Sequence, residues 1–92
     1  MTPQELITLI ATRFPTMRDR VHHTTWDVDE FMAHLGTAST GEQHAMRFIA
    51  SVWNPQYARE MGWNFDAVEA VGSWDREHRL AFASWITDPR WP

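Results

Sequence analysis

The sequence predicts an all-α fold, a compact bundle of about five helices in a single domain, residues 1–92. Three observations support this prediction. Apolar residues recur at helical spacing in several separate stretches, and capping residues, glycines and prolines punctuate them. No stretch alternates apolar and polar residues over five or more positions, and Asn-Gly and Asp-Gly hairpin turns are absent. With 92 residues, 43% of them hydrophobic, the chain is long enough for one core.

The first helix is predicted over residues 3–14. Thr2 can cap its N-terminus, Pro3 suits the first helical position, and Glu5 completes a capping box. Pro15 ends the helix, because the residue before a proline avoids the helical conformation. The apolar residues at helical spacing are Leu6, Leu9, Ile10 and Phe14.

The second helix is predicted over residues 26–35, with Thr24 or Thr25 as its cap and Gly36 as its stop. Acidic residues early in this segment suit the positive end of the helix dipole. The preceding segment, residues 16–24, leaves two interpretations open. It forms either a short polar helix or a solvated connection, since its only apolar residues are Met17 and Val21.

The third helix is predicted over residues 40–53, because Ser39 and Glu42 form a second capping box and Asn54-Pro55 stops the apolar pattern. Phe48 lies on the border of its apolar face. A short helical turn over residues 55–61 is expected to follow. Gly62 ends that turn.

Two more helices are predicted, over residues 65–71 and 74–87, with Asn64 and Ser73 as their respective caps. Gly72 separates them, and Asp88-Pro89 ends the second. The residues expected to face inward are Phe65, Val68, Val71, Trp74, Ala81, Phe82, Trp85 and Ile86.

Residues 31–55 and 65–89 can be aligned at an offset of 34 residues, with identical residues at positions such as Phe31 and Phe65 or His44 and His78. One interpretation is a duplicated helical hairpin, giving two stacked hairpins plus the N-terminal helix. The other is ordinary capping chemistry used twice. The period equals that of tetratricopeptide repeats, but their Trp-x-x-Leu-Gly-x-x-Tyr pattern is missing.

Composition excludes several classes of function. The net charge is −4 and the basic residues, all of them arginines, form no run, so direct nucleic-acid binding is not expected. Without cysteine there are no disulfides, thiolate metal sites or cysteine nucleophiles. No apolar stretch reaches the ~18 residues of a membrane span, and no signal-peptide pattern opens the chain. We therefore expect a cytoplasmic protein without membrane contact.

Five histidines raise the possibility of a metal-dependent enzyme or sensor. Glu30 with His34 and Asp75 with His78 are spaced for contact on one helix face. The other histidines are His22, His23 and His44. No His-Glu-x-x-His motif occurs, and no three ligands share one face. We therefore expect polar surface residues and no bound metal or other cofactor.

The sequence also gives little support to hydrolytic chemistry. Gly-x-Ser-x-Gly and phosphate-binding loops are absent. Ser73, Asp75 and His78 include the right residue types for a triad. They lie within about one helix turn, however, and such neighbours are not expected to form triad geometry. We therefore expect no catalytic residues and a protein that is not an enzyme.

The excess of tryptophan and arginine, residue types enriched at interface hot spots, favours protein binding. Trp63 and Trp91 lie in predicted loop or tail positions, where exposure and core packing both remain open. Acidic residues are expected to face basic clefts of a partner. The candidate partner-binding residues are Asp27, Asp29, Glu30, Trp63, Asp66, Glu69, Arg90 and Trp91.

The segment Ser39-Thr40-Gly41-Glu42, followed by Phe48 and Trp53-Asn54, resembles a pattern in small uncharacterised bacterial and phage-borne proteins. The resemblance covers about one sixth of the chain. It implies a helical fold and an association with mobile elements, but no activity.

The expected function is therefore a non-enzymatic protein-protein interaction module, monomeric or homodimeric. A more specific hypothesis, by analogy with small CRISPR inhibitors, is a phage or mobile-element inhibitor of a host defence or nucleic-acid-processing complex. The alternatives are a self-assembling structural protein, through an uncovered apolar face on the last helix, and the metal-dependent enzyme or sensor.

Overall fold

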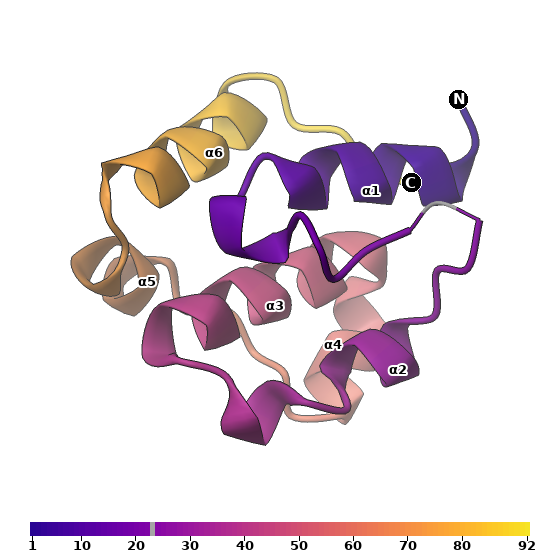
Figure 1. Ribbon diagram of the computed structural model, residues 1–92, viewed down its shortest axis with the longest axis horizontal. Helices are drawn as coiled ribbons and strands as arrows, with labels where there is room; N and C mark the ends of the chain where they lie inside the picture. Colours follow the sequence, from indigo (N-terminus) through magenta and orange to yellow (C-terminus); the bar gives the residue numbers. More distant parts are fainter. Residues whose placement is uncertain (23) are drawn as a thin grey trace.

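Figure 1 shows the computed structural model of the chain, which describes residues 1–22 and 24–92; over these residues it is all-α and contains no strand. The prediction of the fold class is therefore confirmed. The α-helices are α1 (Pro3–Thr12), α2 (Val28–Met32), α3 (Thr40–Trp53), α4 (Pro55–Glu60), α5 (Ala67–Ser73) and α6 (Arg76–Thr87). Two single 3₁₀ turns, η1 (Pro15–Met17) and η2 (Leu35–Thr37), occupy connections. No helix among the described residues is long and apolar enough to cross a bilayer.

Helix α3 lies at the centre of the molecule, with α1, α2, α4, α5 and both 3₁₀ turns packed against it (Figure 1). Half of its residues are buried, and they are spread around its circumference. They are His44, Ala45, Met46, Phe48, Ile49, Ala50 and Val52. A helix that is apolar on most sides is one that neighbours cover on most sides.

The ring of Phe48 is the centre of an aromatic cluster. Its side chain is 2% exposed, and four other aromatic rings have their centroids 5.2–5.6 Å from it. These rings belong to Phe14, Phe65, Phe82 and Trp85. The sequence placed Phe48 only at the border of an apolar face. It becomes central because α1, α5 and α6 converge beside α3.

Both predicted capping boxes are present, at Thr2 with Glu5 and at Ser39 with Glu42. The other predicted caps are wrong. Helices α2, α5 and α6 each begin two residues later than predicted, after Asp27, Asp66 and Asp75. In each case the aspartate carboxylate accepts a backbone N–H of the first turn, which stabilises that start.

An aromatic residue precedes each of these aspartates, namely Trp26, Phe65 and Trp74. A hydrophobic residue before the cap packs back onto the helix and fixes the direction in which the chain enters it. The ring of Trp26 accordingly contacts that of Phe31 at 5.1 Å. The aromatic-Asp pairs therefore set the true starts of three helices.

Several residues predicted to face inward are exposed instead. Val68 is 84% exposed, Ile86 is 54% exposed, and Val71 is also exposed. Gly72 does not stop the helix but lies inside α5, and Ser73 is its last residue. Because α5 starts late and is short, it buries only Ala70 and turns its valines outward.

The 34-residue offset relates the two longest helices of the paired segments, α3 and α6. It does not relate the shorter helices, since α5 corresponds to residues 33–39, where the chain forms η2. The segment 16–24, left open by the sequence, begins within η1 (Pro15–Met17), and its two apolar residues Met17 and Val21 are buried.

Candidate functional site

The acidic candidate residues do not form one surface. Asp27, Asp29 and Glu30 lie at the start of α2, whereas Asp66 and Glu69 lie at the start of α5. Figure 1 shows these two helices on different sides of α3. A single basic cleft on a partner would therefore face one group or the other.

Several of these carboxylates already have local structural roles. Asp27 and Asp66 cap their helices, and Asp29 accepts a hydrogen bond of 2.6 Å from the Tyr57 hydroxyl. That hydrogen bond to Asp29 raises the pKa of Tyr57. Glu30 lines an open hollow of about 210 Å³ whose other lining residues include Trp26 and His34. Asp27, Asp29 and Asp66 therefore have roles within the fold that need no partner.

Trp63 also has a local role, because it closes helix α4. Its backbone N–H donates to the Ala58 carbonyl at 2.8 Å, and the Gly62 N–H donates to Arg59 at 3.1 Å. Gly62 has a φ of 76°, the left-handed conformation that such a helix end requires. The half-buried Trp63 ring meets the ring of Tyr57 edge to face at 5.7 Å. Trp63 thus joins the interior and is not an exposed contact.

Arg90 and Trp91 lie together at the surface. The chain after α6 runs back toward α1 (Figure 1), and the Trp85 indole N–H holds it there by donating to the Arg90 carbonyl at 3.0 Å. The Trp91 ring meets the Trp85 ring edge to face at 5.0 Å. Trp91 is nevertheless 58% exposed. It is thus an anchored aromatic side chain with a free face.

A groove of about 230 Å³ between α1 and the end of α6 adjoins this pair. Its apolar lining comes from Leu6, Leu9, Ile10 and Trp85, and its polar lining from Arg13, Ser84, Asp88 and Arg90. Arg13 donates a hydrogen bond of 2.6 Å to Ser84, which joins the two walls. Arg90 pairs with Asp88 at 3.2 Å. The groove therefore carries two guanidinium groups and one carboxylate, a local positive excess in an acidic protein.

The prediction that the histidines are surface residues is wrong for two of them. His44 and His78 are each 6% exposed, and the Nδ1 atom of His44 has no hydrogen-bond partner. His44 is buried because α3 is covered on most sides. Among residues 1–22 and 24–92, no three His, Asp or Glu side chains are grouped so as to hold a metal ion. His23 lies outside the described residues.

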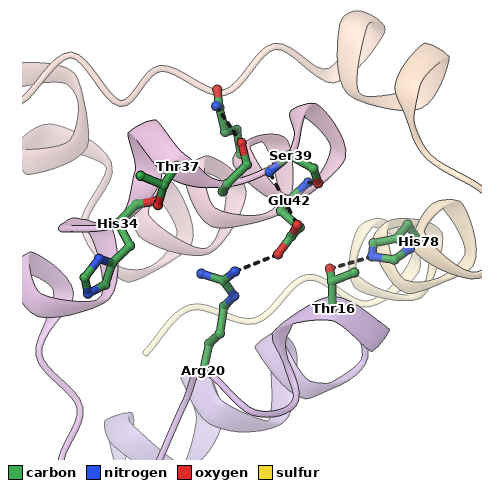
Figure 2. A network of polar contacts seen from close by, with 9 residues as sticks. Thr16, Arg20, His34, Thr37, Ser39, Glu42 and His78 are labelled. Atoms are coloured by element: carbon green, nitrogen blue, oxygen red, sulfur yellow. Dashed lines mark hydrogen bonds and ion pairs between the residues drawn. The ribbon is translucent and has the colours of Figure 1, made fainter.

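His78 bridges two other side chains. Its Nδ1 lies 2.8 Å from Oδ1 of Asp75, and its Nε2 lies 2.8 Å from Oγ1 of Thr16. The contact between Asp75 and His78 agrees with their i,i+3 spacing in the sequence. Ser73 takes no part in this bridge, since the hydroxyl in reach of His78 is that of Thr16 in η1. Figure 2 shows Thr16 and His78 meeting from separate segments of the chain.

A hollow of about 260 Å³ opens beside this bridge, lined by residues that include Thr16, Gly41 and Trp74. Glu42 lines it as well, and Arg20 holds its carboxylate at 2.7 Å (Figure 2). The hydrogen bond from the Ser39 cap, together with Arg20, lowers the pKa of Glu42. The backbone and side-chain hydrogen bonds from His78 lower the pKa of Asp75. Both carboxylates are therefore ionised near neutral pH.

Sequence reasoning missed Arg13 and Thr16. Their hydrogen bonds join residues 71 and 62 positions apart, and neither residue belongs to a motif that would have marked it. The comparisons with protein-family models, curated proteins and solved structures find no match to this chain.

Proposed function

We propose that this protein is a protein-binding module that uses the groove between α1 and α6, together with the exposed Trp91. Its partner is a protein segment that combines an apolar side chain with a carboxylate. The proposal requires no catalysis.

The single observation that carries this proposal is the combination of a groove with apolar and polar lining, two arginines and an exposed tryptophan at one place. Tryptophan and arginine contribute more to interface hot spots than other residue types. Trp85 already holds Trp91 in place, so little side-chain freedom remains to be lost on binding. An exposed apolar site rimmed by polar residues is typical of a binding surface.

The positive excess of the groove supports an acidic partner segment. Arginine forms bidentate pairs with carboxylates, and Arg13 stands at the junction of the two walls beside the apolar lining. One of the two acidic helix starts, that of α2 or that of α5, is proposed to steer basic surroundings of the same partner. The proposal of a phage or mobile-element inhibitor rests further on the size and acidity of the chain and on the resemblance of its segment 39–54.

Affinity capture with matched variants tests the proposal. The intact protein, Leu9→Asp, Trp91→Ala and the control Leu80→Asp are immobilised and exposed to a bacterial lysate. Leu9 is 41% exposed in the groove, whereas Leu80 is 54% exposed on α6 and does not line it. We expect a protein that the intact chain and Leu80→Asp retain and the two groove variants lose. Recovery of the same proteins by all four would contradict the proposal.

Self-assembly is a second candidate, because α5 and α6 expose large apolar side chains, including Val68, Leu80 and Ile86. Light scattering of the intact chain measures its mass. A dimer that becomes a monomer in Leu80→Asp favours this candidate, whereas a monomer at all concentrations eliminates it.

A further inference from the structure

We propose that Thr16 is a nucleophile activated by His78 and Asp75, and that it accepts acyl groups from small activated esters. This inference goes beyond the protein-binding proposal and concerns a different hollow. It rests on a hydroxyl, an imidazole and a carboxylate held in series by two hydrogen bonds of 2.8 Å each. That series is the general arrangement by which a side-chain base activates a hydroxyl.

The hydrogen bonds fix which nitrogen of His78 carries the proton. An ionised carboxylate only accepts hydrogen bonds, so Nδ1 of His78 must donate to Asp75. In the neutral ring Nε2 is then unprotonated and accepts the hydroxyl proton of Thr16. The fold thus holds the base in the tautomer that proton removal requires.

The ring of His78 is also held in position. Its side chain is 8% exposed, and the rings of Phe14 and Trp74 lie 5.9 and 6.4 Å from it. Asp75 is fixed in turn, since its Oδ1 also accepts the backbone N–H of His78 at 2.9 Å. A base with restrained neighbours on both sides needs little rearrangement before it reacts.

The hollow beside Thr16 gives a small substrate access to the hydroxyl. Thr16 is exposed, and the hollow of about 260 Å³ reaches the first turn of α3. The first N–H groups of a helix have no partner within it, and the capping box uses those of Ser39 and Glu42. Among the N–H groups that remain in this turn, that of Gly41 belongs to a residue that lines the hollow, and it is the donor for a developing negative oxygen. Arg20 balances the nearby charge of Glu42.

The reaction balances without a further reagent. Oγ1 of Thr16 attacks the carbonyl carbon of the ester while its proton passes to Nε2 of His78. The bond from that carbon to the leaving alcohol breaks, and the alcohol oxygen takes the proton from Nε2. The products are an acyl-threonine and a free alcohol. Water that enters by the same route releases the acid and restores Thr16.

The test treats the full chain with p-nitrophenyl acetate and locates the acetyl group by mass spectrometry of peptides. We expect acetylation at Thr16, none at that site in Thr16→Val, and retention in Thr16→Ser. Asp75→Asn keeps an oxygen that can cap α6 but removes the carboxylate. We expect it to slow acetylation of Thr16 by about 100-fold.

Thr37 provides the matched control, because its exposed hydroxyl donates only to the backbone of His34. Thr37→Val should leave the labelling of Thr16 unchanged. Equal acetylation of Thr16 and Thr37, an unchanged rate in Asp75→Asn, or no acetyl group on Thr16 would each overturn the proposal. Melting followed by circular dichroism confirms that each variant is folded when it is tested.

Discussion

The aromatic cluster around Phe48 and the Trp85–Trp91 pair use the same kinds of residue for different ends. Trp74, at the edge of the cluster, is 3% exposed, and its indole N–H donates to the Gly41 carbonyl at 2.9 Å. Trp91 is 58% exposed and is held through a single neighbouring ring. Trp85 belongs to both groups, since it contacts Phe48 on one side and Trp91 on the other.

This contrast teaches that aromatic content alone does not separate core from binding surface. What separates them is the number of elements that cover a ring. The cluster lies where α1, α3, α5 and α6 meet, whereas Trp91 is covered from one side only. Substitutions in the two groups, and in the helix ends beside them, test this distinction.

Replacing the ring of Phe48 should lower the free energy of unfolding more than the other substitutions. Phe48→Ala removes the shared partner of four rings, and we expect the free energy of unfolding to fall by about 3–5 kcal/mol. Urea denaturation measures the loss. Val68→Ala, at an 84% exposed position, is the control and should change stability by less than about 0.5 kcal/mol. Equal losses in the two variants would contradict the cluster as the centre of stability.

A substitution at Gly62, where α4 ends and the chain turns to Trp63, should lower the free energy of unfolding by a smaller amount. Gly62→Ala forces a side chain into the left-handed conformation, so we expect destabilisation of about 1–2 kcal/mol. Gly72→Ala is the control, because we expect it to raise the free energy of unfolding. It lies inside α5, where the added carbon would meet no atom of another element within 4 Å, and it should stabilise the fold by about 0.5–1 kcal/mol. The same sign of change in both variants would refute this account.

The capping of α6 by Asp75 makes stability depend on pH. The pKa of Asp75 is lowered in the folded state, so the unfolded chain binds more protons as the pH falls. The stabilisation from Asp75 is therefore present above pH ~4 and lost below it. Unfolding measured from pH 7 to 3 should show intact chain and Asp75→Asn converging at the acidic end. A constant difference between them would argue against a stabilising role of the ionised Asp75 carboxylate.

Replacing Trp91, the exposed member of the Trp85–Trp91 pair, should have the smallest effect on stability. We expect Trp91→Ala to change the free energy of unfolding by less than about 0.5 kcal/mol, because its ring is mostly in solvent already. The same variant should lose the captured partner. A large loss of stability would place Trp91 in the core and remove it from the proposed binding surface.

Local signals explain how much of the fold the sequence predicted. The capping boxes at Thr2 and Ser39 gave the starts of α1 and α3, since both partners of each box lie within one turn. The starts of α2, α5 and α6 were missed by two residues, because Thr24, Asn64 and Ser73 are acceptable caps in isolation. The aromatic-Asp pairs were a readable signal for the correct starts.

The candidate sites were less predictable. Arg90 and Trp91 were identified from their residue types and lie beside the groove. Arg13, which also lines the groove, was not identified. Trp63 proved to be the residue whose backbone N–H caps the C-terminal end of α4. The Asp75–His78 contact was readable from its spacing. Thr16 was not, since its contact with His78 spans 62 positions.

Local patterns in the sequence establish that the chain is helical and where several helices begin and end, because capping and turn chemistry act over three or four residues. The packed fold alone establishes which aromatic rings are covered, which histidines are buried and which hydroxyl meets His78. Those outcomes depend on how α1, α5 and α6 pack around α3, and such packing joins residues that no local pattern connects.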